Sequence, residues 1–142
     1  MKDVPEELYR EILKVTPIPG SLVYVVVQDE VLLLRRNVNP QFGYWSPPAG
    51  SMDMGETPEE TALRELKEES GIELLEETLS FTGYNTYFHP NRQDVTFEFL
   101  ADLDSKPKVE LNLESSNFGW FNKYSLPTPM DKIVKKSLWE VL

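Results

Sequence analysis

The alternation of apolar and polar positions predicts several short strands set among three helices. β-Branched and aliphatic residues fill 21–28 and 31–35, and Asp29 and Glu30 separate the two runs, which is the pattern of a hairpin. Runs this apolar are typical of strands buried on both faces, so we expect both at the centre of a sheet. Further strands are expected at 79–88, 95–103 and 118–121.

The first and last predicted helices lie near the ends of the chain. Pro5 to Val15 has a proline and acidic residues in its first turn, with Leu8, Ile12 and Val15 at helical spacing. A final helix is expected from about Met130 to Leu142, with its aliphatic residues on one side. Between the hairpin and the central helix, residues 37–50 contain turn residues and predict a loop that passes into a short extended stretch.

The central helix has the clearest boundaries. Thr57 can cap its N-terminus, Pro58 suits its first position, and Glu60 completes a capping box. Gly71 suits the left-handed conformation that ends many helices. These signals predict a helix from about Pro58 to Ser70, and the order of all elements predicts helices packed on a mixed sheet in one domain, residues 1–142.

Composition excludes several kinds of site. The chain has 142 residues, no cysteine and one histidine, which rules out disulfides, thiolate nucleophiles and sites built from several histidines. The longest apolar runs, 22–27 and 31–34, are too short to cross a bilayer, and the first residues lack the apolar core of a signal peptide. We therefore expect a soluble, cytoplasmic protein.

The net charge of −10 comes mostly from one segment. Residues 50–77 hold ten acidic and two basic side chains, a local charge of −8, and the rest of the chain carries −2. An acidic chain lacks the basic face that nucleic-acid and membrane-surface binders use, so we expect neither partner. The acidic segment is either a solvated surface helix or a site that holds cations.

The acidic residues of the central helix gather on one face. With Glu65 at zero on a helical wheel, Glu69 lies at about 40° and Glu68 at about −60°. Like charges at this spacing disfavour a helix, and no lysine is interleaved on that face. A hard divalent cation such as Mg²⁺ would offset the repulsion. A solvated acidic face is the alternative that the helix alone leaves open.

The spacing of residues around this helix removes that ambiguity. From Gly50 to Ile72 the chain reads GSMDMGETPEETALRELKEESGI. This segment resembles the box of the Nudix hydrolase family, G-x5-E-x7-R-E-U-x-E-E-x-G-U with U aliphatic, at every defined position. The resemblance implies a Nudix-type α/β/α sandwich with a mixed β-sheet. It also implies hydrolysis of a nucleoside diphosphate linked to another group, assisted by Mg²⁺, with Mn²⁺ as a substitute.

Carried onto this sequence, the resemblance assigns the metal to four residues. Glu65, Glu68 and Glu69 would hold the ion, and the Gly50 carbonyl would add a ligand. Glu56, on the loop before the helix, would be a supporting or outer metal ligand.

The resemblance also suggests catalytic residues. Arg64 would pair with Glu56 and orient a carboxylate without binding metal. The box does not identify the general base, because some family members use a box glutamate, here Glu65 or Glu68, and others a glutamate on a later loop. Glu114 is our first candidate on a later loop.

Two other titratable residues are less suited to catalysis. Glu98 is the second candidate base, but it alternates with Phe97 and Phe99 in a predicted strand, which favours a solvent-facing position. His89 precedes Pro90, and we expect it in a loop rather than in catalysis.

Substrate contacts are expected from residues near the box. Arg35 and Arg36 end a strand ahead of it, where guanidinium groups would suit a pyrophosphate, although a surface ion pair explains them equally well. Trp45 belongs to a pool of aromatic residues from which a base-stacking partner would come, although core packing is the more common role. The pool consists of Phe42, Tyr44, Trp45, Tyr84, Tyr87 and Phe88.

Several functions remain open. The stretch Pro48-Ala49-Gly50 and the later Pro90 resemble the sequence pattern of hydrolases that act on ADP-ribose and sugar nucleotides. The alternative activity is that of a nucleoside triphosphate pyrophosphatase. A non-catalytic nucleotide-binding module and an acidic interaction module are the other classes. The expected partner is a nucleotide-type small molecule, and a homodimer is expected only by family analogy.

Overall fold

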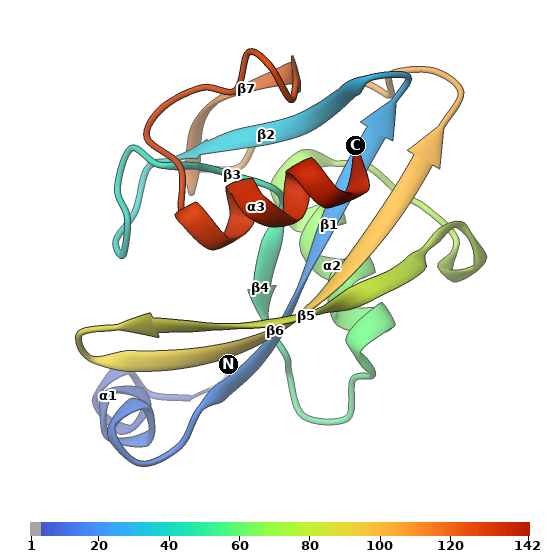
Figure 1. The fold of residues 1–142 in the computed structure, drawn as a ribbon. Coiled ribbons are helices and arrows are strands. Elements are labelled where there is room, and N and C mark those ends of the chain that lie inside the picture. The colour runs from blue at the N-terminus through green and yellow to red at the C-terminus, as the bar shows by residue number, and fades with distance from the viewer. Residues whose placement is uncertain (1–3) are drawn as a thin grey trace.

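A computed structural model describes residues 4–142 of the chain. These residues form three α-helices, seven strands and one short 3₁₀ helix (Figure 1). In chain order they are α1 (Glu6–Val15), β1 (Ile18–Val27), β2 (Glu30–Arg36), β3 (Trp45–Ser46), β4 (Ala49–Ser51), α2 (Pro58–Ser70), η1 (Glu76–Thr78), β5 (Ser80–His89), β6 (Arg92–Leu103), β7 (Ser115–Asn122) and α3 (Lys132–Val141).

The strands form one mixed sheet with β1 near its centre. The order is β3-β2-β1-β6-β5, with β4 also paired to β1 and β7 to β2. β1 and β2 form the expected antiparallel hairpin, whereas β1 and β6 run parallel, from Ile18 opposite Asp94 to Val27 opposite Leu103. The β5–β6 hairpin leaves β5 at the edge of the sheet.

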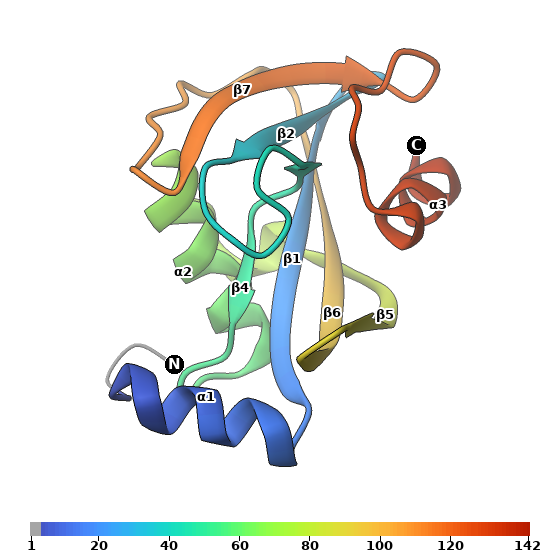
Figure 2. The same cartoon turned by 90° about the vertical axis from the view of Figure 1, so that its left-hand side faces the viewer.

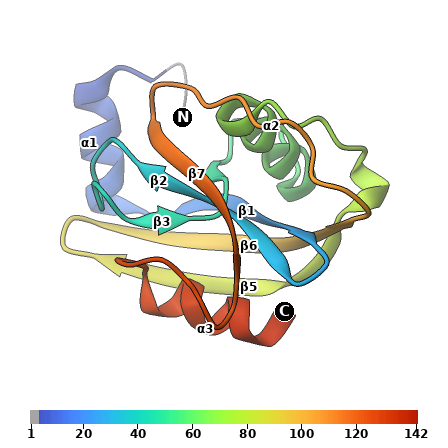
Figure 3. The same cartoon turned by 90° about the horizontal axis from the view of Figure 1, so that it is seen from above.

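Helices cover both faces of this sheet. Figures 2 and 3 show α2 on one side and α3 on the other, with β1 and β2 between them. On the α2 side, Val23 and Val25 pack with Ala62 and Leu66 of the helix. On the α3 side, the alternate residues of β1 pack against the helix in a second cluster that includes Leu22, Tyr24, Val26, Val134 and Leu138. The predicted α/β/α sandwich and the burial of both faces of β1 are therefore confirmed.

The central helix α2 has the predicted ends. Thr57 accepts a hydrogen bond from the Glu60 backbone at 3.1 Å, and the Glu60 carboxylate accepts one from the Thr57 backbone at 3.1 Å. Gly71 ends the helix with φ 75°. Ser21 at the start of β1 donates to the Pro58 carbonyl at 2.8 Å, which ties the first turn of the helix to the sheet. These contacts fix the position of the acidic face.

The N-terminal helix α1 packs loosely. None of its residues is buried, and Leu8 and Val15 are 53% and 82% exposed. Tyr9, Ile12 and Leu13 are the half-buried positions instead. The apolar spacing predicted this helix correctly but does not show which side faces the sheet.

None of the helices within residues 4–142 is long and apolar enough to span a membrane.

Candidate active site

The acidic face of α2 borders a cleft of about 590 Å³. The cleft lies between α2, β4 and the first residues of β1, and it extends to the β5–β6 hairpin and to α3. Acidic, basic and histidine side chains from separate parts of the chain meet around it. They are Arg36, Asp53, Arg64, Glu65, Glu68, Glu69, His89, Arg92, Asp94 and Glu114.

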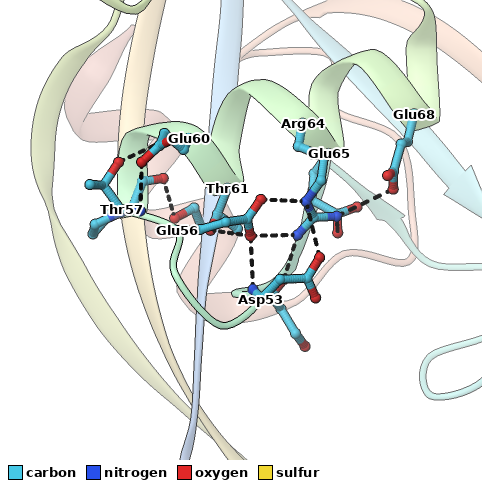
Figure 4. Close-up of polar contacts among 11 residues, drawn as sticks. Asp53, Glu56, Thr57, Glu60, Thr61, Arg64, Glu65 and Glu68 are labelled. Atoms are coloured by element: carbon cyan, nitrogen blue, oxygen red, sulfur yellow. Dashed lines mark hydrogen bonds and ion pairs between the residues drawn. The ribbon is translucent and has the colours of Figure 1, made fainter. Parts of the chain in front are cut away.

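Arg64 is the centre of the polar contacts on this face of α2 (Figure 4). Its Nε donates to Glu56 at 2.7 Å, and its Nη1 donates to Glu65 at 2.8 Å and to Glu68 at 3.3 Å. Its Nη2 donates to the Ser51 carbonyl at 2.9 Å, so one guanidinium joins the helix to β4. The predicted pairing of Arg64 with Glu56 is confirmed, and Arg64 also contacts Glu68 one turn later in the helix.

Glu56 is held by several donors in addition to Arg64. The Asp53 backbone donates to its Oε1 at 2.8 Å, and the Thr61 hydroxyl donates to the same oxygen at 3.0 Å. The hydrogen bond from Arg64 is the main reason that the pKa of Glu56 falls to about 2. Glu56 is therefore an ionised anchor that fixes both the loop and the arginine.

Glu69 and Glu65 are carboxylates whose ionised form is disfavoured by burial. Glu69 is only 7% exposed and accepts a hydrogen bond from the Ala49 backbone at 2.9 Å. Burial raises its pKa well above the ordinary value, and the charge of Glu65 adds to this. Burial also raises the pKa of Glu65, although Arg64 opposes the shift. A second source of positive charge would stabilise both carboxylates in their ionised form.

Gly50 lies directly against the carboxylate of Glu65. A Cβ at position 50 would stand 2.1 Å from Glu65 Cδ and 2.2 Å from its Oε1. A side chain there is incompatible with the position of Glu65, since carbon atoms in contact lie about 3.5–4.0 Å apart. Gly50 and Glu65, which are separated by a fixed number of residues in the box, are therefore in direct contact in the structure.

Glu114 enters the cleft from the loop before β7. Its backbone N–H donates to Asn112 Oδ1 at 2.9 Å, and its carbonyl accepts from the Asn37 N–H at 2.8 Å. Asn112 in turn donates to the Glu68 carbonyl at 3.0 Å, which holds this loop against α2. The charge of Glu114 contributes to the raised pKa of Glu65 and of Glu69, so Glu114 lies within electrostatic reach of both.

The predicted substrate contacts divide into two groups. Arg36 lines the cleft and donates from Nε to the Pro40 carbonyl at 2.8 Å. Arg35 and Trp45 are not among the lining residues. Trp45 instead packs edge-on against Phe121, with ring centroids 5.3 Å apart.

Only one residue of the aromatic pool lines the cleft. It is Tyr87, which is 8% exposed. Phe42, Tyr84 and Phe88 are exposed and are not among the lining residues.

The expectation for Glu98 is wrong. It is 3% exposed rather than solvent-facing. Its carboxylate accepts from Tyr24 at 3.2 Å, from Tyr87 at 3.0 Å and from Asn85 at 2.9 Å. The alternation correctly places Glu98 on the face of β6 opposite to Phe97 and Phe99. However, α3 covers that face as well, so both faces of β6 are interior here.

The β5–β6 hairpin adds polar groups that the sequence pattern did not indicate. Arg92 donates twice to Asp94, at 2.9 and 2.6 Å, and His89 Nε2 lies 3.7 Å from Asp94 Oδ2. His89 is the last residue of β5 rather than a loop residue, because β5 extends to the turn at Pro90. No motif marks these residues, and only the pairing of β5 with β6 brings them together.

The donor chemistry of the cleft fits a hard divalent cation. The candidate ligands are carboxylate oxygens and a backbone carbonyl, which Mg²⁺ and Mn²⁺ accept. Two of the carboxylates, Glu65 and Glu69, have pKa values raised by burial. Within residues 4–142, no group of three or more acidic or histidine side chains is gathered tightly enough to hold an ion as it stands. The contacts of Arg64 with Glu65 and Glu68 explain this, because they direct both carboxylates toward the guanidinium.

Known proteins share both the sequence and the fold. A family model described as the NUDIX domain matches residues 16–139. The human 8-oxo-dGDP phosphatase NUDT18 is 37% identical over 111 residues, which is 76% of this chain but 33% of the human protein. The asymmetrical bis(5'-nucleosyl)-tetraphosphatase of Caenorhabditis elegans is 33% identical over 106 residues, 71% of this chain and 75% of that protein. The chain thus spans about a third of the human relative.

A solved structure agrees with these matches. The crystal structure of a MutT NUDIX hydrolase from Burkholderia pseudomallei has a TM-score of 0.81 and 26% identity. The match covers 89% of this chain and 99% of that one. The same architecture therefore extends over nearly the whole of both chains.

Proposed function

This chain belongs to the NUDIX domain family, and on that premise we propose that it is a pyrophosphohydrolase that cleaves a nucleoside diphosphate linked to another group. The observation that supports the proposal most is the set of carboxylates on one face of α2, at the edge of a cleft of about 590 Å³. Glu69 is the member that a solvated surface helix does not explain, since it is only 7% exposed. A surface helix keeps its charges in water.

We propose that Glu65, Glu68 and Glu69, with the Gly50 carbonyl, hold the divalent cation, and that this is Mg²⁺, with Mn²⁺ able to replace it. When bound, the ion neutralises pyrophosphate charge and polarises the phosphorus that water attacks. Glu69 is already fixed by the Ala49 N–H. Glu65 and Glu68 would exchange their contacts with Arg64 for contacts with the ion.

We propose that Arg64 and Glu56 act as supports rather than as ligands. Glu56 holds the guanidinium of Arg64 at 2.7 Å from one side, so the arginine stays in place when Glu65 and Glu68 turn. The hydrogen bond from Arg64 to the Ser51 carbonyl keeps β4 and the neighbouring Gly50 beside the helix.

We propose that Glu114 is the general base. Its loop is tied to α2 through Asn112, and its charge reaches Glu65 and Glu69. A carboxylate in this position can accept a proton from the attacking water while the box glutamates bind the ion. Arg36 also lines the cleft, and its charge reaches Glu69, so it would contact the phosphates.

The group attached to the nucleoside diphosphate is a separate question. The stretch Pro48-Ala49-Gly50 supports ADP-ribose or a sugar nucleotide. Two of the relatives that are more than 30% identical are named for 8-oxo-dGDP and for bis(5'-nucleosyl) tetraphosphates, which supports a nucleoside di- or polyphosphate. ADP-ribose and 8-oxo-dGDP both contain a purine nucleoside diphosphate, and we propose that this shared part is what the cleft binds.

A substrate panel tests this proposal. ADP-ribose, a sugar nucleotide, a dinucleoside tetraphosphate, and nucleoside di- and triphosphates are incubated with Mg²⁺, and the products are separated by chromatography. Glu69→Gln should reduce turnover by at least about 100-fold. Glu59→Gln, the same change on the same helix but away from the cleft, should keep wild-type activity. Equal activity of wild type and Glu69→Gln would refute the metal assignment, and no turnover in the panel would favour a binding module.

The proposed partners and location come from the sequence. We propose a nucleotide-type small molecule as partner, a homodimer as the assembly and the cytoplasm as the location. Sedimentation at several concentrations tests the dimer, and a single species of 16.4 kDa would contradict it.

A further inference from the structure

The buried carboxylate of Glu98 has no role in the proposed reaction. It is 3% exposed, and the ion pairs among residues 4–142 do not include it. Three neutral donors surround it instead, two tyrosine hydroxyls and the amide of Asn85. A buried carboxylate costs free energy even when it is fully hydrogen-bonded, and an apolar residue would fill the same place without that cost. The arrangement therefore calls for a specific use.

The donors are fixed in one direction. Burial and the charge of Glu98 raise the pKa of Tyr24 and of Tyr87 far above the ordinary value, so both hydroxyls stay protonated. Each donates to a carboxylate oxygen of Glu98. The orientation of both rings is thus set by the position of one carboxylate.

One branch of this network reaches the cleft directly. Tyr87 donates to Glu98 Oε2 at 3.0 Å and lines the cleft, where it is 8% exposed. Tyr24 donates to the other oxygen at 3.2 Å but is fully buried and does not line the cleft. The two tyrosines make the same type of contact with Glu98 and differ in whether they meet the substrate space.

A second branch reaches the cleft through helix α3. Asn85 Nδ2 lies 2.9 Å from Glu98 Oε2 and 2.9 Å from Ser137 Oγ. Ser137 is one turn after Val134, and Val134 also lines the cleft. Glu98 thereby connects strand β6 to β5 and, through one amide, to the helix that carries part of the cleft wall.

We propose that Glu98 is a positioning residue for substrate: it fixes the ring of Tyr87 and, through Asn85 and Ser137, helix α3. Tyr87 and Val134 then form a wall that packs against the nucleoside part of the substrate, away from the carboxylates of α2. This inference rests on the proposed function. Tyr87 and Val134 present an aromatic ring and an aliphatic side chain, which suit a flat, uncharged purine better than a phosphate.

The test compares substitutions that remove the same type of contact at different places. Tyr87→Phe and Tyr24→Phe each delete one hydroxyl from Glu98, and Glu98→Gln keeps the size of the side chain but replaces an acceptor by a donor. We expect Tyr87→Phe and Glu98→Gln to raise KM for the best panel substrate about 5- to 20-fold, with kcat changed less than about twofold. Tyr24→Phe should lower the melting temperature by about as much as Tyr87→Phe does, because each loses one hydroxyl contact with Glu98. It should leave KM within about twofold of wild type.

A binding measurement separates this inference from the proposed function. AMP, which carries a nucleoside but no anhydride bond, is titrated into wild type and into each variant by calorimetry. We expect AMP affinity to fall about 5- to 20-fold in Tyr87→Phe and in Glu98→Gln, and to stay within about twofold in Tyr24→Phe. Ser137→Ala, which cuts the link to α3 alone, should lower AMP affinity by a smaller factor, and it serves in place of Glu98→Gln if that variant does not fold.

The outcomes distinguish the two claims. Absence of turnover by wild type, with AMP bound as expected, would overturn the proposed function. Unchanged AMP affinity in Tyr87→Phe would overturn the role of Glu98, as would equal losses in Tyr24→Phe and Tyr87→Phe or no AMP binding by wild type.

Discussion

Gly50→Ala tests whether the contact between the β4 backbone and Glu65 is needed for activity. The new methyl group would stand 2.1–2.6 Å from three atoms of the Glu65 carboxyl group. Ordinary contact is about 3.5 Å, so the carboxylate must move by roughly 1 Å or more. It is the mobile end of a long side chain and can move without shifting the backbone. Its hydrogen bond from Arg64, at 2.8 Å, is lost in the process.

The expected loss of stability is small and the expected loss of activity is large. The broken bond joins two charged groups that are mostly buried, but the displaced carboxylate regains water in the cleft, so we expect a net cost of about 1 kcal/mol. For a chain of this length, that lowers the melting temperature by about 2–4 °C. Displacement of a reacting or metal-binding group by 1 Å reduces turnover on the order of 100-fold.

Gly55→Ala is the matched control. Gly55 lies in the same segment with φ +89°, and a Cβ there would meet nothing within 4 Å. An alanine in this conformation costs about 1–2 kcal/mol through backbone strain, without touching a carboxylate. Melting curves and Mg²⁺-dependent turnover are measured for both variants. If Gly50→Ala kept the same activity as Gly55→Ala at equal stability, the assigned role of Glu65 would be wrong.

Three further substitutions test the supports around the cleft. In wild type, ionised Glu56 stabilises the fold fully above about pH 4.5, and this stabilisation is lost as the pH falls toward its pKa of about 2. In Glu56→Gln, the decrease in the free energy of urea unfolding between pH 5 and 2 should be smaller than in wild type by on the order of 1–2 kcal/mol. An unchanged pH dependence would contradict the Arg64 contact. Thr57→Ala removes the capping box and should lower stability by about 1 kcal/mol while turnover stays at wild-type level; a loss of turnover would mean that the cap also positions the box. Glu114→Gln should reduce kcat by about 100-fold or more without reducing Mg²⁺ binding in calorimetry, and a parallel loss of metal affinity would make Glu114 a ligand instead of a base.

The sequence predicts the parts of this protein that depend on local spacing. The ends of α2 follow from Thr57, Glu60 and Gly71, each of which acts within one turn of the helix. The shared face of the acidic residues follows from helical geometry alone. The pairing of Arg64 with Glu56 follows only from the family resemblance, since Glu56 precedes α2 and helical spacing does not place its side chain.

The sequence does not predict contacts that depend on how distant elements pack. Glu98 looks solvent-facing in an alternating strand, and only the position of α3 over that face buries it. Arg92 and Asp94 line the cleft because β6 pairs with β5 and places Asp94 opposite Ile18 at the start of β1, which no local pattern encodes. Trp45 was grouped with substrate contacts by its place near the box, but its packing partner Phe121 lies in a strand far along the chain.

Magnesium-dependent stabilisation of wild type and Glu69→Gln tests the central claim, that the carboxylates of α2 hold a divalent cation. At a Mg²⁺ concentration ten times the Kd, binding should stabilise wild type by about 1.4 kcal/mol, or roughly 3–6 °C in the melting temperature. Glu69→Gln should show little or no shift at the same concentration, and Glu59→Gln should behave as wild type. Equal stabilisation of wild type and Glu69→Gln, or none in wild type, would contradict the account.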